Sequence, residues 1–266
     1  MKVIVCVKQV PDTSGKVAVN PDGPLDRASM QTITNPDDMN ALEAALKIKD
    51  ETGCKVVAVT MGPAPAAGML REALAMGADE AVLVSAREFG GSDTYATSQI
   101  LAAAIDTIGV DEDDIVMCGR QAIDGDTAQV GPQIAEKLNL PQITYAADIQ
   151  KTGDSVTVKR MLEDGYMTVK TQTPCLITCI KELNEPRYMS VYGIFDCYSK
   201  PYEVLDYNAL KDDPLIDPTT IGLGGSPTNI LTSFTPPQKG AGMMLEGADK
   251  ATCDQLAGML AAKHMI

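Results

Sequence analysis

The chain has 266 residues, with 22 Lys and Arg against 36 Asp and Glu, so its formal net charge is −14. Nucleic acids and anionic membrane surfaces are bound through an excess of Lys and Arg, so this charge disfavours both as partners. Hydrophobic residues make up 45% of the chain, which is enough for a sizeable core in one or two domains.

The usage of histidine and cysteine narrows the possible chemistry. The one histidine, His264, lies beside the end of the chain, so we do not expect a catalytic triad or a histidine-rich metal site. The seven cysteines are odd in number and form no Cys-x-x-Cys motif, which favours reduced, structural thiols. Because we find neither a signal peptide nor an apolar run of about 18 residues, we expect a cytoplasmic protein without a membrane span.

Strand-like and helix-like segments alternate over the first part of the chain. Short β-rich runs predict strands at residues 2–7, 55–60, 80–85, 114–118 and 142–146. The segments between them predict helices at residues 36–52, 65–76, 93–108 and 127–138, the first with Asn35 as its N-cap. This alternation is typical of βαβ units, so the predicted fold class is α/β: three layers, with a mostly parallel sheet and helices on both faces.

The pattern changes after residue 150. Polar–apolar alternation around an acidic-Gly turn predicts a β-hairpin, and an apolar strand follows it. Residues 184–240 are rich in Pro and Gly with little periodicity, and we interpret Gly222–Gly225 among them as a flexible loop. A last helix is predicted at about residues 249–263. We therefore expect an α/β domain with a hairpin at residues 1–190, and a partner-binding segment with an extended C-terminal arm at 191–266.

Glycines follow three of the predicted strands, at residues 61–63, 90–94 and 119–127. In a parallel sheet ligands bind beyond the carboxyl ends of the strands, and backbone N–H groups at helix starts bind phosphate. Together the three loops fit a nucleotide with two phosphates better than an isolated phosphate. The dinucleotide Gly-x-Gly-x-x-Gly and P-loop motifs are both absent. No nucleophile–base pair is evident, which favours chemistry carried by a cofactor.

Acidic side chains in these loops have simple structural interpretations. We interpret Asp93 as an N-cap, and Asp124 and Asp126 as turn and capping residues, since no third local carboxylate completes a metal site. Arg120 supplies one positive charge for a phosphate.

Several motifs spread along the chain match one known family. They are Val7-Lys8-Gln9-Val10-Pro11-Asp12, Asn35-Pro36, Ala73-Leu74-Ala75-Met76-Gly77-Ala78-Asp79, Gly119-Arg120-Gln121-Ala122-Ile123-Asp124, Val158-Lys159-Arg160 with Glu163-Asp164-Gly165, Pro174-Cys175-Leu176-Ile177-Thr178, and Leu183-Asn184-Glu185-Pro186-Arg187-Tyr188. From Met1 to about Leu231 the chain resembles the β subunit of electron-transfer flavoproteins. It departs from the family at Met167, where Glu or Gln is usual.

This resemblance implies an adenine-nucleotide α-hydrolase-like fold and an obligate heterodimer with an α subunit, whose FAD passes electrons to an acyl-CoA dehydrogenase. Ordinary members hold structural AMP in the β subunit. Members that bifurcate electrons hold FAD there instead, and this FAD accepts hydride from NADH and divides the electrons between the α-subunit FAD and ferredoxin or flavodoxin. Ordinary members lack the Gly90-Gly91-Ser92-Asp93-Thr94 segment found here, so the resemblance implies the bifurcating type.

The resemblance also implies site residues. Adenine and ribose are expected at Cys6, Val7, Lys8, Asn35, Asp38 and Met61, phosphates at Asp124–Pro132, and the FAD-specific phosphate and flavin at Gly91–Thr94. The full expected cofactor-binding set is Cys6, Val7, Lys8, Asn35, Asp38, Met61, Gly62, Gly91, Ser92, Asp93, Thr94, Thr97, Gly119, Arg120, Gln121, Ala122, Asp124, Gly125, Asp126, Thr127, Ala128, Gln129, Val130, Gly131 and Pro132. The partner dehydrogenase is expected at Tyr188, Val191 and Ile194, and Thr13 is expected near the α-subunit flavin.

Two alternatives stay open. One is a conventional electron-transfer flavoprotein β subunit with structural AMP and no NADH oxidation. The other is a nucleotide-binding regulatory module without a redox role, which would be stable as a solitary chain.

Overall fold

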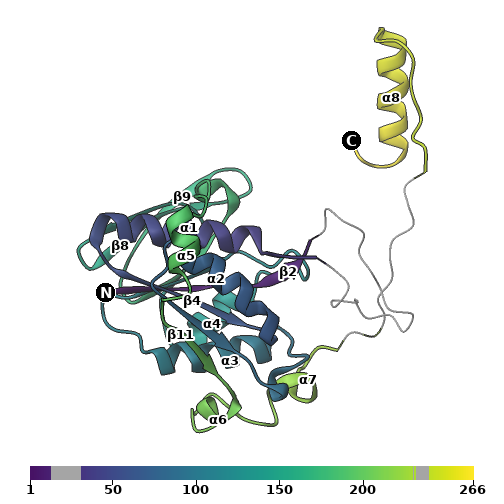
Figure 1. The fold of residues 1–266 in the computed structure, drawn as a ribbon. Coiled ribbons are helices and arrows are strands. Elements are labelled where there is room, and N and C mark those ends of the chain that lie inside the picture. Colours follow the sequence, from purple (N-terminus) through teal and green to yellow (C-terminus); the bar gives the residue numbers. More distant parts are fainter. Residues whose placement is uncertain (13–30, 230, 232–239) are drawn as a thin grey trace. The chain divides into compact units, whose positions relative to one another are not determined.

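A computed structural model of the chain describes residues 1–12, 31–229, 231 and 240–266 (Figure 1). The chain divides into two compact units, Met1–Thr232 and Ser233–Ile266. All the expected cofactor-binding residues lie in the first unit. Thr13 lies outside the described residues.

A single large sheet forms the centre of the first unit. Among the described residues it has nine strands, in the order β11-β5-β4-β1-β6-β10-β7-β8-β9. Their bounds are β1 Lys2–Cys6, β4 Lys55–Met61, β5 Glu80–Val84, β6 Ile115–Gly119, β7 Gln142–Thr152, β8 Ser155–Met161, β9 Tyr166–Gln172, β10 Cys175–Cys179 and β11 Tyr202–Leu205. The pairs from β11 through β7 are parallel, whereas β7, β8 and β9 pair antiparallel. A separate antiparallel pair joins β2 (Gln9–Pro11) to β3 (Thr32–Thr34).

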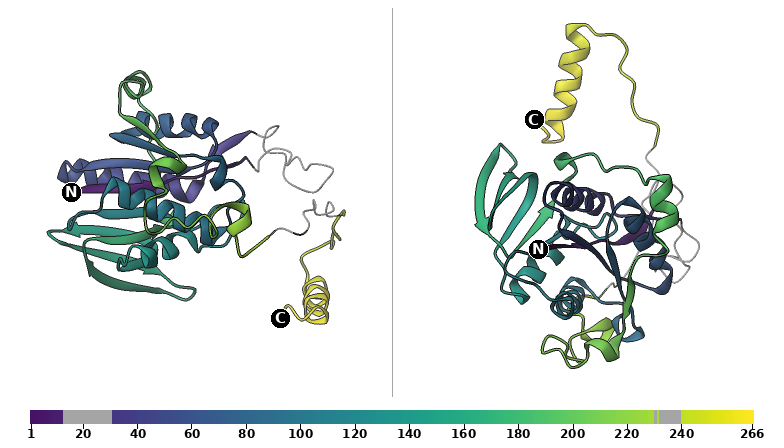
Figure 2. Two further views of the ribbon diagram at one scale, coloured as in Figure 1. Left: turned by 90° about the horizontal axis from the view of Figure 1, so that it is seen from below. Right: turned by 60° about the vertical axis from the view of Figure 1, so that its left-hand side comes forward.

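Helices cover both faces of this sheet (Figure 2). The helices are α1 Pro36–Thr52 and α2 Ala67–Met76 on one face, and α3 Thr94–Ile108 and α4 Val130–Lys137 on the other. Side chains alternate along β1, so Val3 and Val5 pack with α1 and α2, while Ile4 packs with α3 and α4. The predicted α/β class, with helices on both faces of a mostly parallel sheet, is confirmed.

The fourth helix begins later than the sequence predicts. The prediction places its start at residue 127, but α4 begins at Val130. Asp126 and Ala128 have φ angles of 49° and 52°, in the left-handed region, so the chain cannot run through them as a right-handed helix. The loop after β6 is therefore longer than expected, and this lengthens the candidate phosphate loop.

The chain after residue 184 is more regular than the sequence predicts. It contains α5 Val191–Asp196, β11, α6 Tyr207–Leu210 and α7 Gly222–Gly225. Because β11 pairs with β5 in the main sheet, the domain boundary expected between residues 190 and 191 falls inside the first unit. The short one-turn helices and the four-residue edge strand are too brief to produce a recognisable period.

In the second unit the predicted last helix is present as α8, Lys250–Ala262. The described part of the first unit also contains short 3₁₀ turns at Ala64–Ala66, Arg87–Phe89 and Lys181–Leu183.

The cysteines form no disulfide. All seven have free thiols, and six of them are buried, as the prediction of structural thiols requires. Across the described ranges of the chain, we find no helix that is both long and apolar enough to cross a membrane.

The close approach of α4 to the sheet depends on Gly131. A Cβ atom there would lie 2.7 Å from the Cys118 Sγ and 2.8 Å from the Thr178 Cγ2, both on buried strands. We expect Gly131→Ala to lower the free energy of unfolding by about 1–3 kcal/mol because it overpacks this contact. Urea unfolding followed by circular dichroism measures the change.

Gly68 is the matched control, because a Cβ atom at this position in α2 meets nothing within 4 Å. Gly68→Ala is expected to raise the free energy of unfolding by about 0.4–1 kcal/mol. Equal effects of the two substitutions would contradict the close packing of α4.

Candidate functional site

The candidate site lies at the carboxyl edge of the parallel strands. β1 is the switch point of the topology, because the chain moves outward from it through β4 and β5 and then crosses to β6 on its other side. Ligands of open α/β sheets bind at such a point. The loops after β5 and β6 are three strands apart, or about 14 Å at about 4.8 Å per strand. The edge therefore offers two loop clusters at a spacing that a pyrophosphate-linked cofactor can bridge.

The first turn of α1 holds the loop that follows β6. The Asn35 amide donates to the Gln121 carbonyl at 2.8 Å and accepts the Ile123 N–H at 3.1 Å. Asp37 forms a 3.3 Å ion pair with Arg120. The sequence predicts that the Asn35 side chain caps its own helix, but it makes no such hydrogen bond. Both ends of its amide are bound to the loop after β6 instead. We call Asn35, Asp37 and Asp38 the first-turn clamp.

Asp38 is the buried member of this clamp. Its Oδ1 accepts the Gly119 N–H at 2.8 Å and its Oδ2 accepts the Lys8 N–H at 2.9 Å, so one carboxylate joins the ends of β1 and β6. Burial raises the pKa of Asp38 to about 7, against the opposing effect of these two N–H groups. A Cβ atom on residue 119 would lie 2.5 Å from Oδ1, so only glycine fits beside this carboxylate.

The loop before α4 presents open hydrogen-bond donors. The backbone N–H groups from Thr127 to Gly131 donate to no acceptor within the described chain. They include the free N–H groups at the start of α4, where the helix dipole favours negative charge. Lys8 Nζ lies 2.7 Å from Asp124 Oδ1, and Gln121 donates to Asp126, so both acidic side chains fix the loop itself. This arrangement suits a phosphate group.

The second loop cluster follows β5. Asp93 caps α3 as predicted, since its Oδ1 accepts the Ala96 N–H at 3.0 Å. The Ser92 hydroxyl donates to the Phe89 carbonyl at 2.8 Å, so its proton is already used inside the loop. The N–H groups of Gly91, Ser92, Thr94 and Tyr95, and the Thr94 hydroxyl, donate to nothing in the described ranges. These donors are available to a second anionic or polar ligand group.

The third glycine loop, Met61–Pro63, is a weaker phosphate site than the sequence suggests. The Gly62 N–H donates to the Val84 carbonyl at 3.1 Å, and Pro63 has no N–H. Next to this loop, the buried Thr60 hydroxyl has no hydrogen-bond partner within the described residues. Sequence reasoning missed Thr60, although it ends an apolar β-rich run directly before the loop.

Two expected contacts, Cys6 and Val7, are almost fully buried. Burial raises the pKa of the Cys6 thiol to about 12, so it stays protonated and packs as a small apolar group. Asp37 was also missed by the sequence analysis. The sequence did contain a signal for it, because Asp37 lies between Asn35 and Asp38, which were both predicted as cofactor-binding residues.

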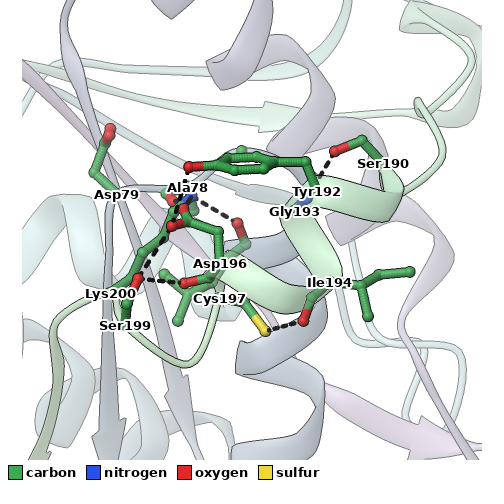
Figure 3. Close-up of polar contacts among 12 residues, drawn as sticks. Ala78, Asp79, Ser190, Tyr192, Gly193, Ile194, Asp196, Cys197, Ser199 and Lys200 are labelled. Carbon is green, nitrogen blue, oxygen red and sulfur yellow. Dashed lines mark hydrogen bonds and ion pairs between the residues drawn. The ribbon is translucent and has the colours of Figure 1, made fainter.

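The expected partner residues lie on or just before α5, and Figure 3 shows Ile194 among them. Tyr188 is 97% exposed and Val191 75%, whereas Ile194 is only 44% exposed. Three aromatic side chains that the sequence analysis did not single out are also largely exposed around them: Tyr192, Phe195 and Tyr198. We call these six side chains the α5 surface. Large exposed apolar side chains gathered on one short segment are typical of interaction sites.

The helix beneath this surface is fixed to the main unit. A Cβ atom on Gly193 would lie 2.1 Å from the Ala75 carbonyl oxygen, which places the α5 backbone directly on the end of α2. Lys200 Nζ donates to the Leu74 and Ala78 carbonyls, each at 2.8 Å, as Figure 3 shows for Ala78. The α5 surface is therefore held in place without a partner.

Comparisons with known proteins agree on one family. Residues 24–204 match the electron transfer flavoprotein domain. The chain is 68% identical to the acryloyl-CoA reductase electron transfer subunit gamma of Anaerotignum propionicum, over 100% of both chains. It is 51% identical to the caffeyl-CoA reductase-Etf complex subunit CarD of Acetobacterium woodii, over 99% of this chain and 97% of the relative. It is 49% identical, over 100% of both chains, to the electron transfer flavoprotein subunit beta of Thermoanaerobacterium thermosaccharolyticum.

Asp38 makes the stability of the protein depend on pH. Its pKa is raised to about 7 from 3.8, so the folded state holds the proton more tightly than the unfolded chain does. Its contribution to stability is therefore full below about pH 4 and is lost as the pH rises through about 7. Asp38→Asn does not titrate, and its amide nitrogen cannot accept the second N–H, at a cost of about 1–3 kcal/mol. We expect the free energy of unfolding of Asp38→Asn to lie below that of wild type, and this difference to become smaller from pH 5 to pH 8.

Urea unfolding midpoints at several pH values measure the difference. The exposed Asp113→Asn is the control and is expected to show no such trend. A deficit of Asp38→Asn that widens toward pH 8 would contradict the raised pKa.

Proposed function

The chain belongs to the electron transfer flavoprotein family as a β-type subunit, and we propose that its carboxyl-edge site binds FAD in an electron-bifurcating complex. The observation that carries this proposal is the presence of two separate groups of open donors. One group, Thr127–Gly131, suits a phosphate. The other consists of the N–H groups of Gly91, Ser92, Thr94 and Tyr95 and lies three strands away. AMP needs only the first group, whereas FAD uses both.

The residues present fit this cofactor. Both donor groups lie at the starts of helices α3 and α4, whose dipoles favour the negative charge of a pyrophosphate. Bound FAD would supply hydride acceptance from NADH and the transfer of single electrons to the α-subunit FAD and to ferredoxin or flavodoxin. The protein's own part is to bind and orient: the α4 start holds phosphate, and the Thr94 hydroxyl and the neighbouring N–H groups hold the flavin half. The first-turn clamp keeps the β6 loop in position.

The names of the relatives guide the choice of partner. Two of them are subunits of complexes named for acryloyl-CoA reductase and caffeyl-CoA reductase. We propose that this chain likewise works in an obligate heterodimer with an electron-transfer flavoprotein α subunit, whose FAD passes electrons to an acyl-CoA dehydrogenase. The α5 surface, with the expected residues Tyr188, Val191 and Ile194, is the proposed contact for that dehydrogenase.

Electron bifurcation couples the two acceptors. In the purified heterodimer with its acyl-CoA dehydrogenase, NADH oxidation under anaerobic conditions is expected to fall at least about tenfold when either ferredoxin or the unsaturated acyl-CoA is omitted, because each NADH delivers one electron to each path. Absorbance at 340 nm measures the rate. A rate that needs no low-potential acceptor, or no NADH oxidation at all, would instead favour the conventional AMP-holding type.

The docking role of the α5 surface is tested by Val191→Asp. A carboxylate at an apolar contact is expected to cost about 2 kcal/mol, which is about a 30-fold rise in the KM for the acyl-CoA dehydrogenase. The FAD content is expected to stay unchanged, because Val191 lies on α5 and not at the carboxyl edge. Met167→Asp, on the exposed strand β9, is the matched control. Equal effects of the two variants would argue against docking at α5.

A further inference from the structure

The Gly222–Gly225 motif is not a free loop. It forms α7, and residues 221–228, which we call the glycine turn, pack on the loop after β5. The Gly222 N–H donates to the Ser92 Oγ at 3.1 Å, and the Leu223 N–H donates to the Gly90 carbonyl at 2.9 Å. These bonds bind the turn to the first half of the Gly90–Thr94 loop.

Asp93 joins the turn to the second half of that loop. Its N–H donates to the Ser226 Oγ at 2.9 Å, and its Oδ2 accepts the Thr228 N–H at 2.9 Å. Its other oxygen, Oδ1, caps α3. One carboxylate therefore fixes both the helix start and the glycine turn.

The close fit of the turn depends on its glycines. Gly222 has a φ of +65°, and a Cβ atom there would lie 2.3 Å from the Glu88 carbonyl oxygen. On the other side, a Cβ atom on Gly91 would lie 2.8 Å from the Leu223 Cβ. The side chain of Leu223 therefore packs directly on Gly91, which is itself in the left-handed region at φ +76°.

The segment that leads into the glycine turn is bound to α3 independently of the loop. Gln99 is buried in the second turn of this helix, and its amide donates to the Leu215 carbonyl and, at 2.8 Å, to the Thr220 hydroxyl. The chain directly before the glycine turn is thus bound to the same helix whose start the turn contacts. The turn can act as a template for the loop rather than as a passive cover.

We propose that the glycine turn is a positioning element for the FAD-specific half of the site. It uses the Gly90 carbonyl and the Asp93 N–H, and it leaves the neighbouring donors of Gly91, Ser92 and Thr94 open in one fixed arrangement. A loop ordered in advance loses less entropy when a ligand binds. This inference rests on the proposed function, and it assigns Leu223 and Ser226 to FAD binding through the loop, without contact to the ligand.

The test compares FAD with AMP in the purified heterodimer after its β-subunit nucleotide has been removed. Leu223→Ala and Ser226→Ala are each expected to weaken FAD binding at the β site about tenfold, while AMP binding changes less than about twofold. Equilibrium dialysis with each nucleotide gives the two affinities. AMP binding is expected to be spared because, among the described residues, the phosphate loop before α4 makes no backbone hydrogen bond to the glycine turn.

Two further variants separate positioning from general damage. Leu223→Met keeps the side-chain volume and is expected to restore FAD affinity, and Ser155→Ala removes a hydroxyl from the distant hairpin without effect. Parallel loss of FAD and AMP affinity, or unchanged FAD affinity in both alanine variants, would overturn the proposal. A wild-type heterodimer that takes up AMP but no FAD at this site would overturn the proposed function itself, and the positioning role with it.

Discussion

The buried carboxylate of Asp38 is the contact on which the rest of the site depends. It accepts hydrogen bonds from the N–H groups of Lys8 and Gly119, at the ends of the adjacent strands β1 and β6. It thereby fixes the switch point, where the strand order of the sheet reverses. Asn35, one turn earlier, binds the same loop through both ends of its amide. The polar start of a single helix thereby shapes the loop that leads to the open N–H groups before α4.

The site has two halves that are held by different parts of the chain. The first-turn clamp organises the half nearest β6, and the glycine turn organises the half that follows β5. A β subunit that holds AMP needs only the first half. Under the proposed function, the contacts around Asp93 order the half of the site that a longer ligand would use. They link this half to Thr228, which is 135 residues away in the sequence.

The sequence predicted the layers of the fold well, because strands such as Lys55–Met61 are short, continuous β-rich runs and helices such as Pro36–Thr52 have clear start and end residues. It predicted local chemistry less well where tertiary contacts override local preference. Asn35 has the residue type of an N-cap but binds a distant loop, and the backbone at Ala128 excludes a helix that its neighbours favour. The Gly222–Gly225 motif resembles a flexible linker in composition, and only its contacts with Ser92 and Asp93 show that it is ordered.

The content of the β-subunit site decides the central claim most directly. Purified αβ heterodimer, denatured and analysed for flavin and nucleotide, is predicted to release two FAD per heterodimer and no stoichiometric AMP. One FAD and one AMP per heterodimer would contradict the account, because the donors of the Gly90–Thr94 loop would then have no flavin to bind.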